Sequence, residues 1–183
     1  MKNKKIKTLI IIAILILIII GAILGGKKLM LKIIYNKDYQ VYVTKYSDEY
    51  IVNEDLVYAI IKAESNFDEN AVSASNAKGL MQLMYATAEE VAEQCGIELT
   101  EENIFDPEIN IELGTRYIST LIERYTNIGV ALAAYNAGMT SVDKWLREGT
   151  ISADGSDIEN IPFKETNNYV RKILRDYEVY KEL

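Results

Sequence analysis

A single glutamate, Glu64, is the first residue whose type and position could support proton transfer. It lies near the end of the apolar segment "AIIKAES" (59–65), in a chain that contains no histidine. On a helix, Leu56, Ile60 and Glu64 share one face, so the carboxyl group would point towards the core. Burial and the negative end of the helix would both raise its pKa, as a general acid requires. The alternative is an ordinary helix-end glutamate that reaches water, and the segment taken alone favours this alternative.

Other kinds of chemistry are excluded by composition. The chain has one cysteine, Cys95, and no histidine, which excludes an internal disulfide, His/Cys metal sites and histidine-based triads. Cys95 follows "EEVAEQ" near an expected helix end, where a small core residue is the simpler interpretation than a reactive thiol. Metal sites built from carboxylates alone stay possible by composition, but no acidic calcium-binding loop motif is present. The sequence therefore predicts neither a metal nor a cofactor.

Three further segments carry polar groups that could serve the same site. "KGLMQLM" (78–84) contains Gly79, where backbone can approach a ligand, and Gln82; "ALAAYNAG" (131–138) contains Tyr135 and Asn136; the C-terminal segment contains Tyr169. Each has an ordinary explanation when taken alone, since Asn-x-Gly often ends a helix and tyrosines often pack half-buried.

Helical patterns predominate after the N-terminal region, and no strand pattern of any length is present. Asn53 and Asp106 are suited to cap helices that begin at Glu54 and Pro107. Thr87 and Ser141 are the expected starts of two further helices, and the last helix is expected from about Pro162. The fold class predicted is mainly α, a single domain over residues 46–183 with five to seven helices.

The N-terminal region is predicted to form a membrane anchor. Residues 9–26 carry no charged or polar side chain, and as a helix they would reach about 27 Å, enough to cross a hydrocarbon core. Residues 1–8 are a short basic cytoplasmic segment and residues 27–45 a basic stem. A cleaved signal peptide is the alternative, but the apolar run is long and lacks a clear small-x-small cleavage site. Lysines on both sides make the orientation ambiguous.

Charge is distributed unevenly along the chain. Eight of the 20 basic residues lie at or before Lys37, whereas all 27 acidic residues follow it. The segment from Asp38 to Leu183 therefore carries a net charge of −15. Such a surface repels phosphate backbones, so nucleic acid is not expected as a partner.

Taken together and in this order, the motifs resemble the soluble lytic transglycosylase catalytic domain, a goose-type-lysozyme-like family. The segments that carry the resemblance are "AIIKAESNFDENAVS", "AKGLMQLMYATA", "FDPEINIELGTRYISTLI", "ALAAYNAG" and "IPFKETNNYVRKIL". They extend over about residues 45–180. The resemblance implies a lysozyme-like α-helical fold.

The resemblance also implies roles for single residues. Glu64 matches the catalytic acid/base, and Tyr169 matches the tyrosine whose hydroxyl is held close to it. The residues implied in substrate binding are Ser65, Gly79, Leu80, Met81, Gln82, Tyr135, Asn136 and Tyr169. Two departures from the family pattern, Asn76-Ala77-Lys78 before "GLMQ" and Tyr85 after it, concern the loop and rim of the site.

The activity implied is non-hydrolytic cleavage of peptidoglycan glycan strands, at the β-1,4 bond from N-acetylmuramic acid to N-acetylglucosamine, forming a 1,6-anhydro ring. Asp68 and Glu69 could supply a second carboxylate, but solvated loop charges are the simpler interpretation. A hydrolytic muramidase and an inactive wall-binding protein are the alternatives. Peptidoglycan and, through the anchor, the cell membrane are the expected partners. The domain is expected outside the membrane, and a role within a wall-spanning machine stays open.

Overall fold

The structure is a computed structural model that describes residues 19, 21, 25–26 and 29–183. The chain divides into two units, Met1–Asn36 with Leu183, and Lys37–Glu182. The predicted membrane span, residues 9–26, lies almost entirely outside the described residues. Among the residues that are described, no helix is both long and apolar enough to cross a membrane.

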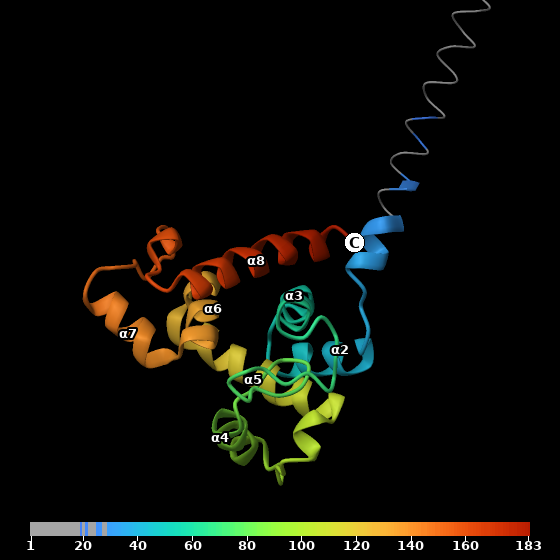
Figure 1. Cartoon of the computed structure of the whole chain (residues 1–183), viewed down its shortest axis with the longest axis horizontal. Helices are drawn as coiled ribbons and strands as arrows, with labels where there is room; N and C mark the ends of the chain where they lie inside the picture. The colour runs from blue at the N-terminus through green and yellow to red at the C-terminus, as the bar shows by residue number, and fades with distance from the viewer. Residues whose placement is uncertain (1–18, 20, 22–24, 27–28) are drawn as a thin grey trace, which may run out of the picture. The chain divides into compact units, whose positions relative to one another are not determined.

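The unit Lys37–Glu182 is built from helices and irregular loops (Figure 1), so the predicted mainly α fold class is confirmed. Its helical elements, in chain order, are α2 (Gln40–Glu49), α3 (Glu54–Glu64), α4 (Tyr85–Cys95), η1 (Asn103–Phe105), α5 (Pro107–Tyr125), α6 (Ile128–Ala137), α7 (Met139–Arg147), η2 (Ile158–Asn160) and α8 (Lys164–Lys181). Helix α2 runs across the predicted border between stem and domain at residue 46.

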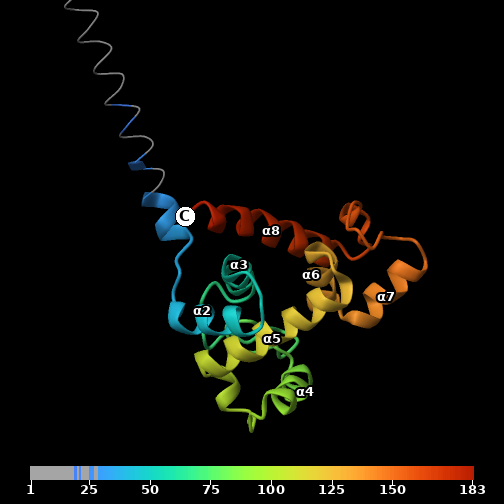
Figure 2. The same cartoon turned by 180° about the vertical axis from the view of Figure 1, so that it is seen from behind.

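Two helices are buried along most of their length. In α3 every residue from Leu56 to Ile61 is buried, and in α6 every residue from Gly129 to Ala134 is buried. Helices buried on all sides need apolar residues all round, which both segments have. Helix α8 packs against α3 and α6, and α5 packs against α6 and α2. In both views α8 passes above α3 and α6 (Figures 1 and 2). Glu64, the last residue of α3, is thereby placed beside α8.

Of the five predicted helix starts, two are confirmed, two lie too late in the chain, and the last helix begins at Lys164, two residues after the expected Pro162. The Asn53 side chain accepts a hydrogen bond from Asp55 N, and the Asp106 side chain accepts from Glu108 N and Ile109 N, as N-caps do. Helix α4 begins at Tyr85, two residues before the predicted cap Thr87. Helix α7 begins at Met139, directly after Gly138, and not at Ser141. In both cases the observed N-cap makes no side-chain hydrogen bond, so no capping residue marks the true start.

The loop between α3 and α4 forms a compact turn around Gly79. Lys78 pairs through its backbone with Val72 and with Leu83, which gives the "GLMQL" segment its fixed irregular shape. Gly79 has a φ of 74°, and a Cβ atom added there would lie 2.3 Å from Asn110 Nδ2. Glycine is therefore required for the left-handed backbone and for the close approach of the Asn110 side chain.

Asn110 is the internal support of this turn. Its side chain is fully buried, accepts a hydrogen bond from Met81 N at 2.8 Å and donates to Lys78 O and Ile104 O. A buried amide with three protein partners satisfies backbone groups that otherwise have no regular structure to pair with. The turn therefore depends on a residue of α5, about 30 positions further along the chain.

We expect Asn110→Ala to destabilise the domain by about 2–4 kcal/mol, because it removes three buried hydrogen bonds and leaves the Met81 N–H and the Ile104 carbonyl without the partner that Asn110 provides. Equilibrium urea unfolding followed by circular dichroism measures the change. The matched control is Asn70→Ala at an exposed loop position, which should change the free energy of unfolding by less than about 0.5 kcal/mol. Equal effects of the two substitutions would contradict the role of Asn110.

Candidate active site

Glu64 is held by a tyrosine from the far end of the chain. It is the last residue of α3, and the Tyr169 hydroxyl of α8 donates a hydrogen bond to Glu64 Oε1 at 2.6 Å. Burial raises the pKa of the Tyr169 hydroxyl well above its usual value, so the hydroxyl stays protonated and can only donate in this pair. The carboxyl group is thereby fixed in one orientation.

Three influences set the pKa of Glu64. Burial is the largest and raises the pKa from 4.5 to about 7, while the hydrogen bond from Tyr169 and the positive charge of Lys172 both lower it. Lys172 also donates from Nζ to Ala63 O at 3.2 Å, at the carbonyl end of α3. The raised pKa that the sequence predicted is confirmed, with burial as its cause. A carboxylic acid with a pKa near 7 can give and take a proton at neutral pH.

A cavity of about 260 Å³ opens beside Glu64. Its wall is formed by residues of four segments: Glu64, Ser73, Ser75, Ala77, Gln82, Met84, Tyr135, Asn136 and Glu165. A second cavity of about 250 Å³ shares Gln82, Met84, Tyr135 and Asn136 with the first and continues towards Tyr117 and Gly138. The two together make an extended, mostly polar groove with Glu64 at its wall.

The tyrosine of "AYNAG" links two walls of this groove. The Tyr135 hydroxyl donates to Met81 O at 2.8 Å, and its ring packs against Tyr117 with a centroid distance of 5.2 Å. Helix α6 is thereby tied to the turn around Gly79. Burial raises the pKa of Tyr135 well above its usual value, so this residue serves as a neutral donor and an apolar wall.

The structure brings some of the sequence-predicted residues to the groove and leaves others away from it. The groove is lined by Glu64, Gln82, Tyr135 and Asn136. Tyr169 is connected to it by its hydrogen bond to Glu64. The side chains of Leu80 and Met81 are fully buried. Ser65 Oγ donates to Ile61 O and accepts from Phe67 N, which closes the end of α3. Gly79 provides the room for Asn110 described above.

Several residues at the site were not found from the sequence. Ser73, Ser75 and Met84 line the first cavity, and so does the exposed carboxylate of Glu165 in the first turn of α8. Thr166 donates a hydrogen bond to Asn136 Oδ1 at 2.7 Å. Thr166, Tyr169 and Lys172 follow one another at intervals of three, which places them on one face of α8. This spacing, which is visible in the sequence, could have indicated that Thr166 and Lys172 face the site together with Tyr169.

Neither loop acid considered from the sequence lines the two cavities. Glu69 accepts a hydrogen bond from the Tyr39 hydroxyl at 2.9 Å, and Asp68 accepts from Asn70 N at 3.0 Å. Glu165 is the second carboxylate that shares a cavity with Glu64.

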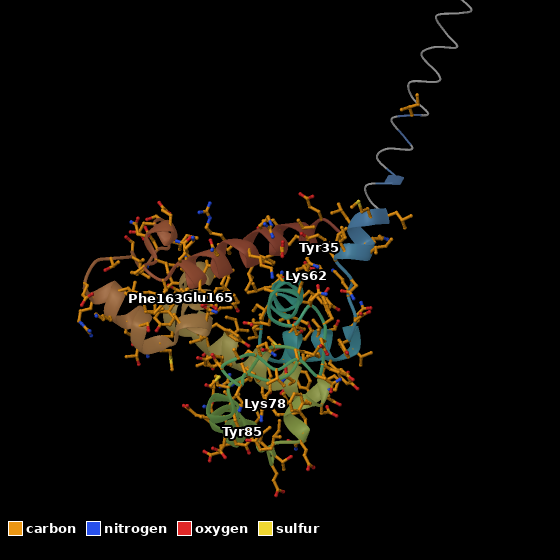
Figure 3. All side chains as sticks on the ribbon, in the orientation of Figure 1. Tyr35, Lys62, Lys78, Tyr85, Phe163 and Glu165 are labelled. Carbon is orange, nitrogen blue, oxygen red and sulfur yellow. The ribbon has the colours of Figure 1, made fainter. Side chains whose placement is uncertain are left out.

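The two departures from the family pattern contact each other at the rim. Lys78 Nζ lies 5.8 Å from the centroid of the Tyr85 ring, and the two side chains are labelled beside α4 in Figure 3. Lys78 also forms an ion pair with Glu101, and Tyr85 OH donates to Leu99 O at 3.3 Å. These contacts join the turn around Gly79 to the segment before α5. Lys78 and Tyr85 therefore stabilise the loop from its outer side and take no part in the contacts that hold Glu64.

Comparisons with known proteins identify the family. The model of the Transglycosylase SLT domain family matches residues 41–156, so the chain belongs to this family. A soluble lytic murein transglycosylase of Salmonella typhimurium is 33% identical over 141 residues, which cover 75% of this chain and 22% of that protein. The chain therefore spans about a quarter or less of the length of such relatives.

Solved structures agree with this assignment. An inactive mutant of the lytic transglycosylase Slt from Pseudomonas aeruginosa superposes with a TM-score of 0.76 and 33% identity, over 83% of this chain and 25% of that one. The 70 kDa soluble lytic transglycosylase of Escherichia coli gives 0.74 and 28%, over the same shares. The predicted lysozyme-like fold of this family is confirmed.

We expect Tyr169→Phe to raise the pKa of Glu64 above about 7, by about one unit, because the carboxylate loses a charge-assisted hydrogen bond. Lys172→Met should raise it by less, about 0.3 unit, because water screens an exposed charge. Carbon-13 NMR titration of the labelled glutamate carboxyl groups, assigned with Glu64→Gln, measures both shifts.

Lys164→Met, at the exposed start of α8, is the matched control and should leave the Glu64 titration unchanged. An activity that needs protonated Glu64 falls as the pH rises through this pKa, so both variants should move that fall to higher pH. A lower pKa in Tyr169→Phe would show that the hydroxyl does not stabilise the carboxylate.

Proposed function

We propose that this chain is a peptidoglycan lytic transglycosylase that cleaves the β-1,4 bond from N-acetylmuramic acid to N-acetylglucosamine and leaves a 1,6-anhydro end. The observation that carries the proposal is Glu64, with a pKa of about 7 at the wall of a polar groove and a 2.6 Å hydrogen bond from Tyr169. Membership of the Transglycosylase SLT domain family supports it.

In the first step Glu64 acts as a general acid. The protonated carboxyl group gives its proton to the glycosidic oxygen, and the bond between C1 and that oxygen breaks. The acetamido oxygen of the same sugar stabilises the positive charge that develops at C1, which replaces a second carboxylate. Tyr169 then stabilises the carboxylate that forms, because its hydroxyl already donates to Oε1.

In the second step the Glu64 carboxylate acts as a base. It takes the proton from the 6-hydroxyl group of the same sugar, and O6 bonds to C1 and closes the anhydro ring. Glu64 regains its proton, no water is consumed, and the nucleophile reacts within one molecule, where proximity lowers the entropic barrier. Gln82 and Asn136 hold amide and hydroxyl groups of the glycan, and Tyr135 forms an apolar wall.

A hydrolytic muramidase is the second candidate, and one observation favours it. Glu165 lines the same cavity as Glu64, and paired carboxylates are the usual arrangement of glycosidases. In that reaction Glu165 would activate a water molecule, and the product would carry a free reducing end. Glu165 is exposed, whereas Glu64 is held in place by Tyr169, so the single-carboxylate route fits the two environments better.

Mass spectrometry of digested peptidoglycan separates the two reactions, because an anhydro end is one water lighter than a reducing end. We expect anhydro products from the wild type and a loss of about 10²–10⁴-fold in rate for Glu64→Gln. Glu165→Gln should lose less than about tenfold and still yield anhydro ends. Reducing ends that disappear in Glu165→Gln would establish the muramidase instead, and inactivity of the wild type would favour a wall-binding protein.

We further propose that residues 9–26 anchor the chain in the cell membrane, with residues 1–8 inside and the catalytic domain outside. The support is the uncharged apolar run with its lysine-rich flanks and the location of peptidoglycan outside the membrane.

Protease added to intact, wall-stripped cells should digest the domain while a cytoplasmic control protein stays whole. The band of the intact protein should disappear from immunoblots that use an antibody against the C-terminal part of the chain. A domain that is cut only after the membrane is permeabilised would reverse the orientation, and release into the medium would indicate a cleaved leader.

A further inference from the structure

The loop that follows α3 joins two residues of the groove. Glu64 is the last residue of α3, and the loop begins directly after it. At the other end of the loop, the Ala71 carbonyl accepts a hydrogen bond from Gln82 Nε2 at 3.0 Å. Glu64 and Gln82 both line the first cavity, so a movement of the 65–71 loop would reach both of them.

The backbone of this loop adopts an uncommon conformation that needs support. Asn66 has a φ of 51° and Phe67 a φ of 68°, so two consecutive residues lie in the left-handed region. Asparagine is found there more often than most residues, but a bulky residue is rare there and persists only where its surroundings hold it. The Phe67 ring packs against the Tyr58 ring of α3 with a centroid distance of 6.4 Å. The first half of the loop is therefore held by α3.

The second half of the loop is held by Tyr39. The Tyr39 hydroxyl donates to Glu69 Oε2 at 2.9 Å, across 30 positions of the sequence. Burial, and after it the Glu69 carboxylate, raise the pKa of Tyr39 to about 12, so the hydroxyl stays protonated and acts as the donor. Asp68 N donates to Ser65 O and Asn70 N donates to Asp68 Oδ1, bonds that stay within the loop. The bond from Tyr39 ties the loop to another element.

Tyr39 is held beside the beginning of α3. Two residues before it, Lys37 Nζ donates to Asp55 Oδ1 at 2.8 Å, in the first turn of α3. The same ammonium group lies 5.4 Å from the centroid of the Tyr58 ring. Tyr39 is also the N-cap residue of α2, with a φ of 60°. Residues 37–39 therefore connect the first turn of α3 with the loop that follows its last residue.

We propose that Tyr39 is a positioning residue for the groove, because its hydroxyl holds the loop between Glu64 and the carbonyl to which Gln82 donates. The inference rests on the proposed function and adds a residue outside the segment 41–156 that the family model matches. Positioning of this kind affects rate strongly, since a displacement of about 1 Å caused far from the reacting atoms can cost about 100-fold.

The place of Tyr39 in the chain gives the proposal a wider consequence. The first unit of the chain ends at Asn36, and Tyr39 follows three positions later. The stretch that joins the domain to the preceding unit is therefore also the stretch that supports the groove. A substitution in this stretch should alter catalysis although it lies outside the groove.

The test compares Tyr39→Phe with Tyr42→Phe, which removes the hydroxyl of another half-buried tyrosine three positions later. The release of anhydro ends from soluble peptidoglycan fragments, measured over a range of concentrations, gives kcat and KM. Tyr39→Phe should lower kcat about fivefold and lower the midpoint of thermal unfolding by less than about 4 °C. Tyr42→Phe should change kcat less than about twofold.

Variants of the partner test the hydrogen bond itself. Glu69→Ala should lower kcat as much as Tyr39→Phe, and the double variant should lose no more than either single variant, because all three lack the same bond. Glu69→Gln keeps an oxygen that accepts from the tyrosine and should stay within about twofold of the wild type. Multiplied losses in the double variant, or equal losses in Glu69→Ala and Glu69→Gln, would overturn the proposal.

Hydrogen exchange followed by mass spectrometry gives a readout that needs no activity. In Tyr39→Phe, peptides that contain residues 65–71 and 79–83 should exchange about fivefold faster, while peptides of α5 and α6 stay unchanged. Faster exchange throughout the domain would show a general loss of stability, and no local change would show that the bond holds nothing; either result overturns the inference. Glu69→Ala takes the place of Tyr39→Phe in this comparison should the latter fail to fold.

The exchange comparison also separates this inference from the proposed function. A wild-type chain that releases no anhydro ends would refute the proposed function. The local rise in exchange at residues 65–71 and 79–83 would still show that Tyr39 positions these two parts of the groove.

Discussion

The hydrogen bond between Tyr169 and Glu64 is the interaction on which the site depends. It joins two residues 105 positions apart, and it holds the carboxyl group where burial raises its pKa to about 7. Burial and the hydrogen bond act in opposite directions on that pKa. Burial alone would favour the neutral acid and oppose the first proton transfer, which leaves a carboxylate, whereas the hydrogen bond from Tyr169 stabilises that carboxylate. The balance of the two allows one residue to serve as acid and then as base.

Helix α8 organises the site from one face. Thr166, Tyr169 and Lys172 lie at intervals of three and reach Asn136, Glu64 and the end of α3 in turn. Since α8 also packs against α3, this helix pair contributes both to the folded core and to the polar contacts that order the site. A shift of α8 would disturb all three contacts together.

The opposite wall of the groove is irregular backbone, which needs support of another kind. Asn110 satisfies the turn around Gly79 from inside, and Lys78 with Tyr85 and Glu101 ties it to its neighbours at the rim. These supports fix the carbonyls to which Gln82 donates. The place of Gln82 in the groove thus depends on hydrogen bonds that lie beneath it.

The sequence by itself determined the helical class, the caps at Asn53 and Asp106, and the place of Glu64 at the end of an apolar helix, because these depend on neighbours within one turn. It also contained the motifs that gather at the groove. Only the tertiary structure decided that Leu80 and Met81 are buried, that Glu165 shares the cavity of Glu64, and that Thr166 holds Asn136. Each of these depends on contacts between segments far apart in the chain. Such contacts set burial and the direction of a side chain, and they do not follow from neighbours within one helical turn.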